Sequence, residues 1–120
     1  MEIRRQEGAA GPLVRGFRGR SFLVGETAFE RGLILTPDAA VGFDGPLSVE
    51  AVEPALAIDP PPEFLLIGTG PALIQPNAGF RSALAERGVG LEAMDSRAAA
   101  RAWRLLRDEG RWISAVLLAL

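Results

Sequence analysis

The feature that most constrains the fold is the stretch Glu63–Gly70, in which the apolar run Phe64–Ile67 leads directly into Gly68-Thr69-Gly70. A short apolar run that ends at turn residues is typical of a strand buried on both faces. Glycine allows the backbone to turn tightly and to approach another segment closely, so the strand is expected to end there. The sequence therefore predicts a buried strand followed by a tight loop.

The residues after this strand predict a β-α-β unit. A helix is expected over about Asn77–Glu86, stopped by Gly88, and a second apolar strand over Val89–Met94. Units of this kind place their two strands parallel in one sheet.

A second helix and a last strand extend the unit. Asp95 or Ser96 is expected to cap a helix over Arg97–Asp108, because both side chains accept hydrogen bonds from first-turn amides. The segment Arg111–Leu118 is rich in apolar residues and predicts a strand. Residues 63–118 therefore predict a β-α-β-α-β core of an α/β protein.

The first half of the chain predicts short strands. One strand is expected over Gly16–Val24, followed by a turn at Gly25-Glu26, a strand within Ala28–Leu35 and a third over Ala39–Phe43. Sequential strands usually pair, so these segments favour an antiparallel meander.

A short helix is expected between the meander and the buried strand. Ser48 is a candidate cap for a helix within Val49–Ile58, and Pro54 suits only a first helical turn. The run Asp59–Pro62 cannot continue a helix and serves as a stiff connector.

The length of 120 residues predicts one domain, residues 16–120, preceded by a flexible tail of residues 1–15. The N-terminal stretch has no apolar core of a secretory signal, and Glu2 and Glu7 argue against a transit peptide. The apolar runs are far shorter than the ~20 residues that span a bilayer. We therefore expect no membrane span, with the cytoplasm as the default location.

The composition excludes several chemistries. The chain has no histidine, cysteine, tyrosine or lysine, and its net charge is −2. Disulfides, Cys/His zinc sites, a Walker lysine, Schiff bases and histidine triads are therefore excluded within this chain. The charge predicts no general affinity for nucleic acid. We expect no catalytic residue, no metal and no cofactor, and hence no enzyme.

Polar loops at the ends of the two parallel strands form the first candidate site. These loops should lie side by side at the edge of the sheet where α/β proteins often hold ligands. The glycines only partly match a dinucleotide fingerprint, because Leu73 replaces the third glycine. A tight turn and a helix cap explain the same residues, so both interpretations stay open. The candidate ligand-binding residues are Gly68, Thr69, Gly70, Asp95, Ser96 and Arg97.

The second candidate site is a row of arginines on the second helix. Arg97, Arg101 and Arg104 are spaced by four and three residues, which places them on one face. Such a row can contact an acidic protein partner or a phosphate. A solvated helix face explains the same pattern.

The order of motifs resembles a known family. The segments FLLIGTG, ERGVGLEAMDSRAAARAW and LLRDEGRWISAVLL are similar to those of small uncharacterised bacterial and archaeal proteins with a Mth938-like domain. That family also contains the mitochondrial NADH dehydrogenase (complex I) assembly factor 3 and the adipogenesis-associated domain protein. The similarity extends from about Gly16 to Leu118. It is most specific at Gly68–Gly70, at Gly88–Met94 with the following Asp95–Arg97, and at Glu109–Arg111.

The chain departs from the family pattern after Asp95. Ser96 replaces a threonine, Ala100 stands where cysteine is common, Ala102 where threonine is, and Arg104 replaces an asparagine. If the family's polar cluster binds a ligand, these replacements weaken that role here.

The resemblance implies a three-layer α/β fold with a mixed central sheet and an additional antiparallel β-ribbon. It implies no established catalytic activity and no cofactor. It favours a non-catalytic, protein-binding or assembly-factor-like domain, with respiratory-complex or membrane-protein assembly components as candidate partners and homo-oligomerisation left open. The alternative from another class is a small-molecule, nucleotide or phosphate binder that uses the strand-end loops.

Overall fold

The structure, a computed structural model, describes residues 11–120. Residues 1–10 of the expected tail lie outside the described part of the chain. The expected start of the domain at Gly16 falls inside the first strand, β1 (Val14–Arg18).

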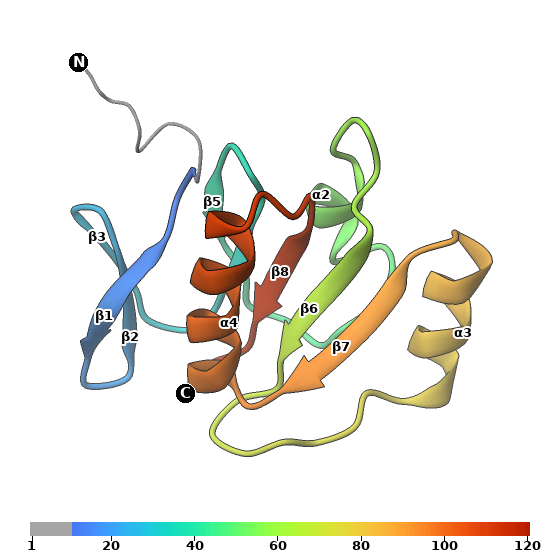
Figure 1. Ribbon diagram of the computed structural model, residues 1–120. Helices are drawn as coiled ribbons and strands as arrows, with labels where there is room; N and C mark the ends of the chain where they lie inside the picture. The colour runs from blue at the N-terminus through green and yellow to red at the C-terminus, as the bar shows by residue number, and fades with distance from the viewer. Residues whose placement is uncertain (1–10) are drawn as a thin grey trace.

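A five-stranded mixed sheet forms the centre of the molecule (Figure 1). Its strand order is β5-β4-β8-β6-β7, in which the first three strands are antiparallel neighbours and β8, β6 and β7 run parallel. The predicted mixed sheet and parallel β-α-β core are thereby confirmed. Its strands are β4 (Leu33–Leu35), β5 (Ala40–Gly42), β6 (Phe64–Gly68), β7 (Gly90–Met94) and β8 (Ser114–Leu117).

Helices cover both faces of this sheet, so the predicted three-layer arrangement is also confirmed. The chain passes from β6 through α3 (Ala78–Glu86) to β7, and then returns through α4 (Ser96–Asp108) to β8 on the other side of β6. Figure 1 shows α4 on one face of the sheet and α2 (Glu53–Leu56) on the other.

The buried strand β6 connects the two hydrophobic cores because its side chains alternate between the faces. Leu66 packs in the core that contains Trp103 of α4. Leu65 and Ile67 pack in the core that contains Leu84 of α3. The apolar run of β6 is therefore buried on both faces, as its sequence predicts.

The last strand is shorter than expected and occupies the middle of the sheet. β8 covers only Ser114–Leu117, and all four of its residues are buried. It lies between β4 and β6. The central strand of the sheet is thus β8. The apolar strand that ends at Gly68, β6, is its neighbour.

A separate three-stranded ribbon contains β1, β2 (Ser21–Val24) and β3 (Thr27–Phe29) in sequential antiparallel order. The expected single strand over Gly16–Val24 is wrong, because the chain reverses at Gly19, whose φ of 59° suits a turn. The predicted turn at Gly25 is confirmed. The predicted N-terminal antiparallel ribbon is therefore present, with one more hairpin than expected.

The expected strand within Ala28–Leu35 is divided between the two sheets. Its first part belongs to β3 of the ribbon, and its second part is β4 of the main sheet. Gly32 stands at the junction, where an added Cβ would lie 2.6 Å from the carbonyl oxygen of Leu117. Only glycine permits this close approach, which brings β4 beside β8.

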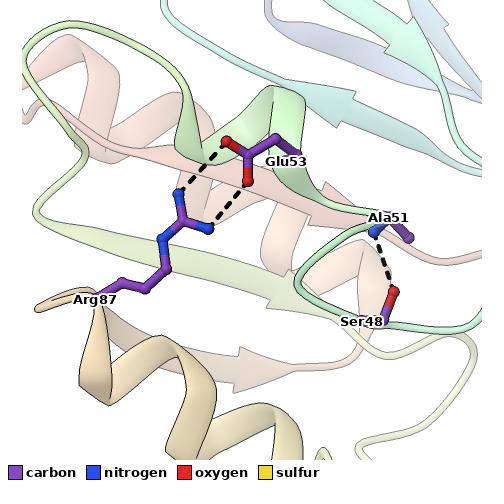
Figure 2. A network of polar contacts seen from close by, with 4 residues as sticks. All are labelled: Ser48, Ala51, Glu53 and Arg87. Carbon is purple, nitrogen blue, oxygen red and sulfur yellow. Dashed lines mark hydrogen bonds and ion pairs between the residues drawn. The ribbon is translucent and has the colours of Figure 1, made fainter.

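The helix before β6 is a single turn, and its start differs from the prediction. The hydroxyl of Ser48 accepts a hydrogen bond from the amide of Ala51 at 3.0 Å (Figure 2), which closes a turn before the helix. Val52 is the N-cap of α2, and Pro54 lies in the first turn as expected. The proposed cap of this helix by Ser48 is therefore wrong. The helix begins later, because Pro54 can be accommodated only in a first turn, where the amide has no helical partner.

Candidate functional site

The two loops at the ends of β6 and β7 lie together and bond to one another. The amide of Gly70 donates to the hydroxyl of Ser96 at 2.8 Å, and the amide of Ser96 donates to the carbonyl of Gly70 at 2.8 Å. The Ser96 hydroxyl donates in turn to the carbonyl of Leu118 at 2.7 Å. Ser96 is completely buried. The predicted juxtaposition is present, and these polar groups bond to groups of the chain itself.

The glycines of the loop are required by close packing and by backbone conformation. An added Cβ on Gly68 would lie 2.8 Å from both the Cα and the hydroxyl of Ser96. Gly70 has a φ of 104°, which L side chains rarely adopt. The N-terminus of α4 therefore approaches the end of β6 because position 68 carries no side chain.

Thr69 organises the loop that leads to α3. Its hydroxyl donates to the carbonyl of Ala72 at 2.7 Å and accepts from the amide of Ile74 at 3.0 Å, while its amide donates to the carbonyl of Met94 at 2.8 Å. The loop displays Leu73 and Ile74, which are 53% and 66% exposed. Thr69 thus fixes a loop that presents apolar side chains to solvent.

Asp95 and Arg97 begin α4 and point to different surroundings. One carboxylate oxygen of Asp95 accepts a hydrogen bond from the amide of Ala98 at 2.9 Å, the contact of an N-cap. The Arg97 guanidinium lies 4.8 Å from the ring centre of Phe17 in β1. The structure brings Asp95 to the strand ends, whereas the guanidinium of Arg97 contacts the ribbon.

A hollow of about 240 Å³ adjoins the strand ends and includes Thr69 from the predicted set. Its lining is mostly apolar, and its polar members offer no carboxylate, arginine or nucleophilic pair. The lining residues are Pro46, Leu47, Thr69, Ile74, Gln75, Pro76, Asn77 and Leu118.

The arginine row borders a groove between α4 and the ribbon. Arg101 and Arg104 are exposed on α4 and face Arg15 of β1 across a groove of about 240 Å³. Within residues 11–120, neither these three arginines nor Arg97 forms an ion pair with a carboxylate. The groove is lined by Val14, Arg15, Gly16, Phe17, Ala100, Arg101 and Arg104.

Sequence reasoning missed the β1 side of this groove. Arg15, Gly16 and Phe17 lie far from α4 in the chain, because the helix begins only at Ser96. Arg15 falls within the expected tail, residues 1–15, and no local sequence pattern indicates that it meets the helix. The indole N–H of Trp103 donates to the carbonyl of Pro12 at 2.8 Å, and this long-range contact helps to hold the ribbon against α4.

Other arginines are engaged within the domain. Arg111 contacts Glu63 at 2.7 Å and, chiefly through a hydrogen bond, lowers the pKa of that carboxyl below its ordinary value. Arg107 is buried, donates to the carbonyl of Arg111, and lies 6.0 Å from the rings of Trp103 and Trp112.

The described part of the chain has neither a carboxylate cluster for a metal nor a membrane-spanning helix. Across residues 11–120 there is no cluster of three or more aspartates or glutamates placed to hold a metal ion. None of the helices in the same range is both long and apolar enough to cross a membrane.

Comparisons with known proteins agree with the fold. The chain is 28% identical over 122 residues to the NADH dehydrogenase [ubiquinone] 1 alpha subcomplex assembly factor 3 of Danio rerio, covering 98% of this chain and 70% of that protein. An NMR structure from Xanthomonas campestris is 30% identical, covers 98% of this chain and 92% of that one, and has a TM-score of 0.75.

A Bordetella pertussis protein described as a Mth938-like domain is 22% identical, with a TM-score of 0.78 over 98% of this chain and 92% of that one. This likeness supports the fold. The family model described as "Protein of unknown function (DUF498/DUF598)" matches residues 14–118. The resemblance inferred from the sequence is confirmed, and the chain belongs to the DUF498/DUF598 family.

Proposed function

We propose that this protein is a non-catalytic, protein-binding domain of the assembly-factor type. The similarity to an assembly factor extends over 98% of the chain. The observation that carries the proposal is the arginine row Arg97, Arg101 and Arg104, which is exposed beside a groove and has no ion-pair partner in the described part of the chain. We assign these three arginines to contacts with a protein partner.

The strand-end loops have a structural role in this proposal. The groups of Gly70 and Ser96 that a ligand would contact already bond to each other and to Leu118. Thr69 holds the next loop in the same way. These contacts favour a structural role for the loops, which fix α4 to the sheet. They do not favour a binding site for a nucleotide or phosphate.

Capture of a partner tests the proposal. The tagged chain is used to isolate cross-linked proteins from its source organism, and the affinity of a recovered protein is measured against the double variant Arg101→Gln/Arg104→Gln. We expect weaker binding by this variant and unchanged binding by Arg81→Gln, since Arg81 lies on α3 and bonds to Gln75. The first candidates for the partner are assembly components of respiratory complexes or membrane proteins, because the similar protein is an assembly factor.

A ligand screen tests the opposite possibility. Thermal unfolding is measured with nucleotides, phosphates and organic acids, where a ligand at 100 times its Kd adds about 2.7 kcal/mol of apparent stability. We expect no stabilisation. A clear shift that disappears in Asp95→Asn, together with turnover and no captured partner, would overturn the proposed function.

A further inference from the structure

We propose that the groove between β1 and α4 binds an acidic segment of a partner protein in an extended conformation. The segment's backbone lies along β1, and its carboxylates contact Arg15, Arg101 and Arg104. This inference rests on the proposed function and adds the chemistry of the partner and its mode of binding.

The groove combines a strand edge with a helix face. Four consecutive residues of β1, Val14–Phe17, form one side, and Ala100, Arg101 and Arg104 of α4 form the other. β1 is an edge strand, because its one neighbour in the ribbon is β2. An edge strand presents unpaired amides and carbonyls, and an extended peptide can add to it as a further strand.

Gly16 leaves the middle of the groove open. Gly16 is half-buried, and a Cβ added at this position would meet no heavy atom within 4 Å, so there is open space on the side where a side chain would project. The pairing of β1 with β2 is irregular between Val14 and Gly16, which leaves Arg15 at a bulge. Bulges re-aim side chains, and at this one Arg15 lines the groove.

The charges of the groove select an acidic occupant. Arg15 uses its Nε–H for the carbonyl of Gly25 at 2.8 Å, which leaves the terminal guanidinium N–H groups for a ligand. No carboxylate of residues 11–120 pairs with Arg101 or Arg104. Three arginines from two elements therefore line one groove, and carboxylates of a bound segment can neutralise their charges.

The same observations favour a peptide over a nucleic acid. Grooves that bind single-stranded nucleic acid combine a basic surface with free aromatic faces for base stacking. The aromatic residue of this groove, Phe17, already has the Arg97 guanidinium over its ring at 4.8 Å. The net charge of −2 also gives the protein no general attraction to a polyanion.

The test uses a labelled peptide of four Thr-Glu repeats, blocked at both ends, with a Thr-Gln peptide of the same length as control. Binding to the full chain is followed by fluorescence anisotropy at low salt, and the amide signals of β1 by NMR. We expect the Thr-Glu peptide to bind, the Thr-Gln peptide not to bind, and the signals of residues 14–17 to shift. The affinity should fall with added salt, since the charges are exposed.

Two variants separate charge from the strand edge. Arg101→Gln/Arg104→Gln should weaken binding roughly threefold to tenfold, as expected for two exposed ion pairs. Gly16→Leu adds a side chain whose Cβ meets no atom within 4 Å, at a position that lines the groove, and should abolish binding. Gly42→Leu is the matched control, because an added Cβ at this position on β5 also meets open space. Thermal unfolding verifies that each variant is folded, and the double arginine variant provides an independent test should Gly16→Leu unfold.

Unchanged peptide binding by Gly16→Leu would overturn the groove assignment. Binding of a single-stranded DNA octamer as tight as that of the Thr-Glu peptide and insensitive to Gly16→Leu would overturn it too. If a captured partner protein binds Gly16→Leu normally but loses affinity for Arg101→Gln/Arg104→Gln, the proposed function stands and the strand-edge mode is wrong.

Discussion

The arginines on the two faces of the main sheet have different surroundings. On one face, Arg87 after α3 forms two contacts with Glu53 of α2, at 3.0 and 3.4 Å (Figure 2). On the other face, Arg101 and Arg104 of α4 have no carboxylate partner among residues 11–120. The comparison indicates that Arg87 connects two helices of the domain, whereas Arg101 and Arg104 are available to another molecule.

The N-termini of α3 and α4 also differ in how they are held. Asn77 caps α3 after a loop, and the cap accepts from the amide of Phe80 at 2.8 Å. α4 follows β7 directly, and its first residue, Ser96, is bonded to Gly70 and Leu118. The helix that carries Arg101 and Arg104 is therefore also the helix whose start is fixed to the sheet, which holds the arginine row in one orientation.

The largest expected effect tests how α4 supports the groove. Trp103→Ala removes a fully buried indole that also donates to the carbonyl of Pro12, and should cost about 3–5 kcal/mol in urea unfolding. Amide exchange in β1–β3 should become faster. Leu84→Ala on α3 is the comparison: it should lower the stability but leave the ribbon's relative protection intact. Equal loss of ribbon protection in both variants would contradict the separate role of α4.

The next effect concerns the junction of β6 and α4. Ser96→Ala removes the acceptor of the Gly70 amide and the donor to Leu118, and should cost about 1–3 kcal/mol because buried polar groups lose their partners. Ser82→Ala, at an exposed position of α3, is the matched control and should change little. A stability equal to that of wild type in both variants would show that the junction does not hold α4.

A smaller effect is expected at the helix caps. Asp95→Ala should cost about 0.5–2 kcal/mol in urea unfolding, and Asp95→Asn should restore most of it because asparagine also caps. Asn77→Ala should cost a similar amount on α3. If Asp95→Asn keeps the stability but loses partner binding, the carboxylate contributes more than a cap, and Asp95 belongs to the binding site.

The ion pair of Arg111 with Glu63 should also influence the pH dependence of stability. The hydrogen bond from Arg111, supported by its charge, lowers the pKa of Glu63 in the folded protein. The ion pair therefore contributes to the folding stability above the unfolded-state pKa of Glu63. This contribution is lost as the pH falls through the folded-state pKa of Glu63. The stability difference between wild type and Glu63→Gln should shrink between neutral and acidic pH. A difference that grows on acidification would have the wrong sign.

The sequence predicted the second half of the fold better than the first. The β-α-β-α-β core depends on local signs, such as the apolar run before Gly68 and the cap at Asp95, and these correspond closely to β6 and α4. The ribbon depends on where the chain reverses and which sheet each strand joins. Gly19 and Gly32 decide this through a turn and a close approach that have no periodic pattern.

The two candidate sites also differ in how far the sequence predicts them. The meeting of the Gly70 and Ser96 loops followed from parallel strands, which end at one edge of the sheet. That their polar groups would bond to each other depends on tertiary distances that no sequence pattern gives. The groove beside the arginine row requires β1, and its residues Arg15 and Gly16 join α4 only through the folded ribbon.

The most direct test of the account is the affinity of the blocked Thr-Glu peptide for three proteins, measured by calorimetry under one low-salt condition. The proteins are wild type, Arg101→Gln/Arg104→Gln and Arg87→Gln. The account predicts roughly threefold to tenfold weaker binding by the α4 variant and unchanged binding by Arg87→Gln, whose side chain is paired with Glu53. Equal affinities for all three proteins, or a larger loss in Arg87→Gln, would contradict it.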